Sequence, residues 1–118
     1  MIQIQKELKI FTKFMTGFSN KMELKIKKNK ISENKIIEIS KNPKIILYNS
    51  KGKYFVSNGI CPHAKWPLEL GSVKEDILTC GGHGWEFNIK NGKCKSNPGR
   101  DLKKYNVTEI NDTIIISD

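Results

Sequence analysis

Two short segments near the middle of the chain contain residue types that bind metals. The first is Cys61-Pro62-His63, and a spacer of sixteen residues separates it from the second, Cys80-Gly81-Gly82-His83. Both histidines of the protein and two of its three cysteines belong to these segments. Glycine and proline are typical of loops whose backbone approaches an inorganic centre closely. Each segment therefore offers one thiolate and one imidazole from a loop.

Three interpretations of these four side chains compete. The first is two unrelated buried cysteines with two surface histidines, but soft ligands clustered in glycine-rich loops favour a metal. The second is a structural zinc ion, although zinc sites more often take a cysteine pair from one element and a histidine pair from another. The third is a two-iron core, in which two cysteines bind one iron and two histidines bind the other. The mixed pair in each loop favours this third interpretation.

The spacing of these ligands resembles the Rieske motif. Gly84-Trp85-Glu86-Phe87 is similar to the continuation of the second loop in Rieske-type ferredoxins and oxygenase Rieske domains, and Asn97-Pro98-Gly99 to the family's proline-containing third loop. The resemblance runs from about Leu24 to the C-terminus. It implies one Rieske-type [2Fe-2S] cluster per chain, with four ligands: Cys61, His63, Cys80 and His83.

Ligand charge determines the electron chemistry expected of such a cluster. Two ferric ions, two sulfides and two thiolates sum to zero, whereas an all-cysteine cluster carries two negative charges before reduction. Adding an electron to a neutral centre costs less, so imidazole ligation raises the reduction potential. The resemblance places the imidazole rings at the protein surface, which makes His63 and His83 the expected exit for the electron.

The resemblance also separates this chain from the high-potential Rieske proteins of respiratory complexes. Those proteins have a cysteine in each cluster loop, joined in a disulfide, where this chain has Trp66 and Gly82. They also have Ser and Tyr hydroxyls where this chain has Trp85 and Phe87. Fewer hydroxyl donors to sulfur make the reduced cluster less stable. We therefore expect a low potential, near the lower end of the roughly −150 to +300 mV Rieske range.

Alternating apolar residues separated by turn residues predict an all-β fold. The predicted strands are residues 24–26, 36–39, 45–48, 54–56, 85–89, 105–110 and 113–116, with turns at 49–52, 90–92 and 111–112. The resemblance implies an antiparallel β sandwich or barrel as a base, with a small inserted cluster-binding subdomain at about residues 60–99. The predicted Rieske domain covers residues 22–118. Residues 1–21 are predicted to be an N-terminal extension, with a short helix over 5–18 where apolar residues recur at helical spacing.

Length and composition narrow the function classes. A chain of 118 residues suits one domain. Its 21 Lys and Arg exceed its 12 Asp and Glu, but Arg100 is the only arginine, so we expect no nucleic-acid partner. The positive charge favours either general solubility or docking on acidic partners. No apolar run is long enough to span a bilayer, and no signal-peptide pattern is present, so we expect a cytoplasmic location.

The predicted function is a soluble one-electron carrier rather than an enzyme. It would pass electrons from a reductase to a terminal acceptor such as an oxygenase. The chain is too short to be an oxygenase catalytic subunit, and no spare histidines could form a mononuclear iron site of two His and a carboxylate. Two alternatives stay open: a small Rieske subunit of a larger reductase complex, and a zinc-binding interaction module with Cys2His2 ligation.

Overall fold

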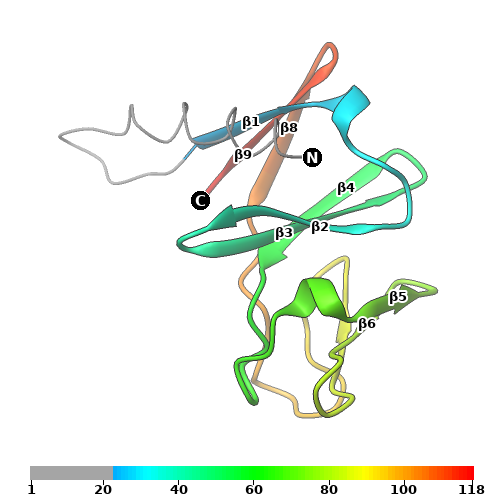
Figure 1. The fold of residues 1–118 in the computed structure, drawn as a ribbon, viewed down its shortest axis with the longest axis vertical. Helices are drawn as coiled ribbons and strands as arrows, with labels where there is room; N and C mark the ends of the chain where they lie inside the picture. The colour runs from blue at the N-terminus through cyan, green and yellow to red at the C-terminus, as the bar shows by residue number, and fades with distance from the viewer. Residues whose placement is uncertain (1–22) are drawn as a thin grey trace, which may run out of the picture.

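The computed structural model describes residues 23–118 (Figure 1). The strands are β1 (Glu23–Lys27), β2 (Ile36–Lys41), β3 (Lys44–Ser50), β4 (Lys53–Asn58), β5 (Ser72–Lys74), β6 (Ile77–Thr79), β7 (Glu86–Asn88), β8 (Asn106–Ile110) and β9 (Thr113–Ser117). Two short 3-10 helices, η1 (Lys28–Lys30) and η2 (Leu68–Leu70), complete the regular structure of this part of the chain. The predicted helix over 5–18 and the predicted extension 1–21 lie outside the described residues.

The strands form three antiparallel sheets, which confirms the predicted all-β fold. Their strand orders are β1-β9-β8, β2-β3-β4 and β5-β6-β7. The first two sheets make up the base, in the upper part of Figure 1, and the third lies in a small lobe of residues 60–99 below it. This lobe is inserted between β4 and β8. Strands β5 and β6 were not predicted, because three residues each are too few to show an alternating pattern.

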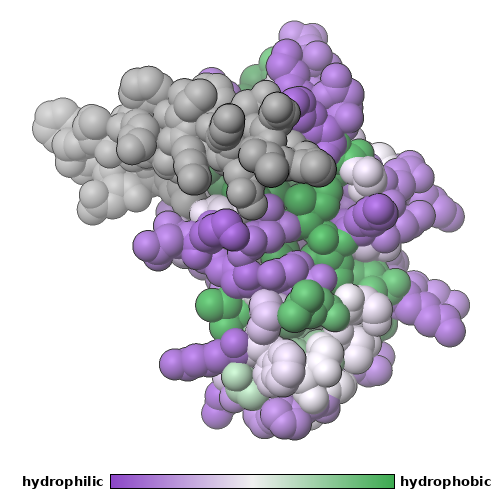
Figure 2. Space-filling model, viewed as in Figure 1, coloured by the Kyte–Doolittle hydropathy of each residue, from purple (hydrophilic) through white to green (hydrophobic). Residues whose placement is uncertain are grey.

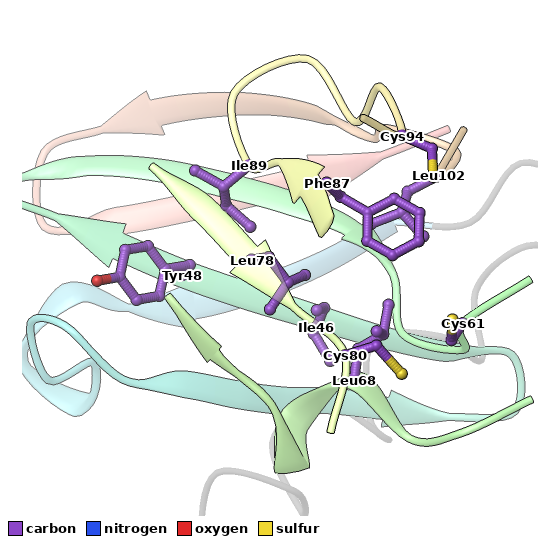
Figure 3. Close-up of a cluster of buried hydrophobic side chains, with 10 residues drawn as sticks. All are labelled: Ile46, Tyr48, Cys61, Leu68, Leu78, Cys80, Phe87, Ile89, Cys94 and Leu102. Carbon is purple, nitrogen blue, oxygen red and sulfur yellow. The ribbon is translucent and has the colours of Figure 1, made fainter. Parts of the chain in front are cut away.

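Strand β3 separates two hydrophobic cores, because successive side chains of a strand point to opposite faces. Ile45 and Leu47 lie in the base core, with residues of β1, β2, β4 and β9. Ile46 and Tyr48 lie in the lobe core (Figure 3), whose other members are Cys61, Leu68, Leu78, Cys80, Phe87, Ile89, Cys94 and Leu102. The small lobe is therefore packed directly onto the outer face of β3.

Lys44, at the start of β3, ties the base to the small lobe through two carboxylates. Its Nζ donates to Glu38 in β2 and, at 2.8 Å, to Glu69 in η2, and all three side chains are less than a quarter exposed. Burial alone would raise the pKa of the Glu38 carboxyl, but the bonds from Lys44 and Lys41 lower that pKa below its ordinary value. Glu69 Oε1 is buried without a hydrogen-bond partner.

Lys104 also contacts both the base and the small lobe. Its Nζ donates to the carbonyl of Ile89 at 2.9 Å and lies 5.3 Å from the centroid of the Phe55 ring in β4. Burial lowers the pKa of Lys104 to about 8. The charged ends of both lysines thus lie near the boundary where the small lobe meets the base.

Candidate metal centre

Two loops at the end of the small lobe share one backbone hydrogen-bond pattern. Loop 1 is Cys61–Trp66 and loop 2 is Cys80–Trp85. In each loop the N–H of the first residue donates to the carbonyl of the last, at 2.9 Å in loop 1 and 2.8 Å in loop 2. The carbonyl of the first residue accepts from the N–H of the fifth, Lys65 at 2.8 Å and Gly84 at 3.1 Å. Lys65 and Gly84 both have positive φ, 58° and 76°, so the two loops are copies of one turn.

The four predicted ligands come together with the thiols inside and the imidazoles outside. Cys61 and Cys80 are buried in the lobe core, and their thiols are close enough to interact. His63 and His83 are exposed, with ring centroids 4.7 Å apart in an edge-to-face arrangement. The two loops therefore hold one neighbouring pair of buried thiols and one neighbouring pair of exposed imidazoles.

The surroundings of the Cys61 thiol act on its pKa in opposite directions. Burial raises the pKa of the Cys61 thiol, and the neighbouring Cys80 thiol raises it as well. The backbone N–H groups of His63 and Ala64 oppose this rise, because they stabilise the thiolate. At the second loop, the N–H of Gly82 donates to the Cys80 sulfur at 3.4 Å. Burial prevails at Cys61, so the pKa of its thiol is raised above the ordinary value.

These side chains fit a two-iron cluster better than a single metal ion. Within residues 23–118, no three side chains of His, Cys, Asp or Glu are gathered so that they could hold one ion. A zinc ion needs four ligands around one point. Each iron of a Rieske [2Fe-2S] cluster needs only two protein ligands. The buried sulfur pair and the exposed imidazole pair supply one such set each.

Comparison with known proteins gives the family. The family model of the Rieske [2Fe-2S] domain matches residues 19–106. This chain belongs to the Rieske family. Membership implies a Rieske-type [2Fe-2S] cluster as the cofactor.

Several Rieske relatives resemble parts of the chain. Chlorophyllide a oxygenase of Arabidopsis thaliana is 34% identical over 74 residues, 63% of this chain and 14% of that protein. The ferredoxin component of biphenyl 2,3-dioxygenase from Rhodococcus jostii RHA1 is 33% identical over 54 residues, 46% of this chain and 50% of that protein. The ferredoxin subunit of biphenyl dioxygenase from Pseudomonas sp. KKS102 is 34% identical over 64 residues, 52% of this chain and 59% of that protein. The match thus spans between a seventh and three fifths of these relatives' lengths.

Solved structures share the Rieske fold. The ferredoxin of Sphingomonas yanoikuyae B1 is 26% identical, with a TM-score of 0.69 over 78% of this chain and 93% of that one. A chain from the complex of oxygenase and ferredoxin in carbazole 1,9a-dioxygenase gives a TM-score of 0.73 at 19% identity, over 80% of this chain and 92% of that one. At that identity the likeness concerns the fold alone.

The Rieske resemblance placed Trp66 and Gly82 at the positions of an absent disulfide, and the structure brings these two residues together. A Cβ added to Gly82 would lie 2.3 Å from the Trp66 ring. The three cysteines of the chain are free. Trp85 in loop 2 stacks on His63 in loop 1, with ring centroids 4.4 Å apart and planes 14° from parallel. The sequence carries a signal for these contacts that motif analysis overlooked: each loop has a tryptophan five residues after its cysteine.

Cys94 lies outside the Rieske ligand set, in the third loop. It is buried and pairs with Phe87 in an isolated β-bridge. In Figure 3 the Phe87 ring lies between Cys94 and the cysteines of loops 1 and 2. The Cys94 N–H donates to Asp101 Oδ1 at 2.9 Å, and its sulfur accepts from the N–H of Asn97 at 3.3 Å. Cys94 therefore stabilises the third loop, as an ordinary packed cysteine would.

No helix within residues 23–118 has the length and hydropathy needed to cross a bilayer.

Proposed function

We propose that this Rieske chain is a one-electron carrier whose cluster is bound by Cys61 and Cys80 on an inner iron and by His63 and His83 on an outer iron. The observation that carries the proposal is that the same two loops hold a pair of exposed, adjacent imidazoles and a pair of buried, neighbouring thiols. When bound, the cluster supplies reversible transfer of one electron. The exposed imidazoles then provide the shortest route between the cluster and a partner protein.

The rest of the small lobe holds these ligands in place and keeps water from the inner side. Phe87 and Leu68 are fully buried beside the two cysteines. Backbone N–H groups donate to both sulfurs and orient them. We assign residues 22–118 to the Rieske domain, with the cluster-binding subdomain at about 60–99 and residues 1–21 as an extension. This assignment is supported by the insertion of the small lobe between β4 and β8.

The proposed donor is a reductase and the proposed acceptor is an oxygenase, both in the cytoplasm. Two of the relatives are ferredoxin parts of biphenyl dioxygenases, and a third is the ferredoxin component of an alkene monooxygenase system. This chain would be the corresponding electron carrier and would bind no organic substrate itself.

A potentiometric titration of the holoprotein tests this function. We expect one reversible electron per chain, with a midpoint well below 0 mV at neutral pH, about −150 mV. Within the described part of the chain, the donors to the two sulfurs are backbone N–H groups, and no Ser, Thr or Tyr hydroxyl donates to them. A reduced cluster with fewer donors is less stable, which lowers the potential.

The same sample separates the electron carrier from a zinc-binding module. An iron–sulfur protein is coloured, whereas a colourless protein with one bound zinc would contradict the carrier function. A clearly positive midpoint would contradict the low-potential assignment while leaving electron transfer intact.

We further propose that partners dock on the tip formed by loops 1 and 2 and η2. Two of the exposed large hydrophobic residues are here, Trp66 at 41% and Leu70 at 65% exposed. Residues 60–99 contain five lysines and four carboxylates, so the lobe carries little of the net charge of +9. Figure 2 shows the lower lobe as mostly pale, below a base with large hydrophilic areas. The proposed partner surface is therefore apolar at its centre, with carboxylates opposite rim lysines such as Lys65 and Lys95.

Electron self-exchange between oxidised and reduced copies tests the tip without a known partner. Leu70→Ser should slow self-exchange about tenfold, because each encounter loses an apolar contact from both copies, about 1.4 kcal/mol in total. Exchange broadening in NMR spectra of oxidised and reduced mixtures measures the rate. The matched control is Ile110→Ser, since Ile110 is 51% exposed at the β8–β9 hairpin of the base. Equal effects of the two variants would mean that the electron does not leave through the tip.

A further inference from the structure

The tryptophan that ends each loop packs on the opposite loop. Trp66, the sixth residue of loop 1, lies against Gly82, the third residue of loop 2. Trp85, the sixth residue of loop 2, stacks on His63, the third residue of loop 1. The same two loop positions are in contact in both directions, so the arrangement is reciprocal.

We propose that Trp66 and Trp85 are positioning residues that together clasp the two cluster loops and fix the plane of the His63 ring. This inference rests on the proposed function, in which His63 binds the outer iron. Loops 1 and 2 are separated by thirteen residues in sequence, and no disulfide joins them, so besides the cluster itself only noncovalent contacts hold the loops in register. Stacked aromatic rings have a preferred geometry, which suits them to this role.

Adding one methyl group at Gly82 is enough to disturb the contact between Trp66 and loop 2. The three ring atoms of Trp66 nearest to an added Cβ would be 2.3–2.5 Å away, a distance at which the ring must move. Gly82 does not have the positive φ that makes alanine strained, so Gly82→Ala acts through the tryptophan ring rather than through the backbone. Gly81 provides a matched control one residue earlier, because its added Cβ would meet only the Leu70 carbonyl, at 3.2 Å.

The test measures how fast the holoprotein loses its cluster to an iron chelator, followed by the visible absorption of the cluster. Gly82→Ala and Trp66→Ala should each speed the loss about tenfold, and Gly81→Ala should leave it within about twofold. In the Trp66→Ala background, Gly82→Ala should add nothing, because the space that its methyl group needs is then empty. Trp66→Phe should restore most of the wild-type rate, since a smaller ring still covers Gly82.

Trp85→Ala tests the effect on the His63 ring by a measurement that a purely structural role of Trp85 would leave unchanged. It frees the His63 ring, so the EPR g-values of the reduced cluster should shift, while far-UV circular dichroism and thermal unfolding of the base should not.

Two outcomes would contradict the proposed positioning role. Gly82→Ala and Gly81→Ala could lose the cluster at the same rate, or Gly82→Ala could have the same effect with and without Trp66. If Trp66→Ala fails to take up the cluster, the rates of cluster loss from Gly82→Ala and Gly81→Ala still test the proposal. A wild-type protein without a Rieske spectrum would instead refute the proposed function itself.

Discussion

Replacing His63 or His83 by alanine is expected to abolish the Rieske absorption and EPR spectra completely. The protein has two histidines in all, and both are proposed ligands of the same iron, so no other imidazole can substitute. An iron left with one protein ligand and open to water is not retained. The measurement is the visible and EPR spectrum of each purified variant after reconstitution with iron and sulfide.

Cys94→Ser is the matched control for the ligand variants. Cys94 is buried, as the two proposed cysteine ligands are, but lies on the other side of Phe87, and a serine oxygen can still accept from the Asn97 N–H. The Cys94 variant should therefore keep the spectrum that Cys61→Ser and Cys80→Ser lose. The ligand assignment is wrong if Cys94→Ser loses the cluster while Cys61→Ser retains it.

Lys44→Met is expected to reduce the free energy of unfolding by about 2 kcal/mol at pH 7. The change leaves Glu69 without the ammonium group that it now contacts and leaves Glu38 with only the more distant Lys41. Removing one partner of a fully buried ion pair costs about 3–5 kcal/mol, and partial exposure of these groups reduces that figure. The measurement is denaturant unfolding followed by far-UV circular dichroism.

The effect of Lys44→Met should shrink as the pH falls. The pKa of Glu38 is lowered in the folded protein, so its contribution to stability is present above the unfolded pKa of about 4.3 and is lost as the pH falls through the lower folded value. Wild type and variant should therefore converge below about pH 4. Lys41→Met is the control, because Lys41 is mostly exposed and its bond to Glu38 is 3.4 Å long; it should cost less than about 0.5 kcal/mol. A loss that grows at low pH, or equal losses from both variants, would contradict this role for Lys44.

The features that sequence analysis recovered depend on local patterns. The strands of the base have five or more residues each, enough for apolar alternation to appear, and they were predicted close to their observed bounds. The Rieske family was recognised from ligand spacing, which is also local. The assignment of the four ligands stays a prediction, supported by the way the structure brings the four side chains together.

The features that sequence analysis missed depend on contacts between distant residues. Lys44 and Glu69 are 25 positions apart, and nothing in either segment indicates that their charges meet. The positive φ of Lys65 and Glu75 also has no marker in the residue types, since glycine, asparagine and aspartate are the usual residues there. The packing of Trp66 on Gly82 requires knowing that loops 1 and 2 face each other. Such contacts follow from the tertiary fold, whereas the motif indicates only the four proposed iron ligands.

The two faces of β3 have a consequence for how this protein acquires iron. Ile45 and Leu47 complete the base core with residues that all lie outside the small lobe, so the base can fold before any iron is delivered. In a chain whose lobe had not yet closed, Ile46 and Tyr48 on the opposite face would be exposed to water. Such an exposed apolar stripe would favour closure of the lobe, but it would also favour aggregation with other incompletely folded chains. Iron supply would then limit the yield of soluble protein during overproduction, even though the metal lies outside the base.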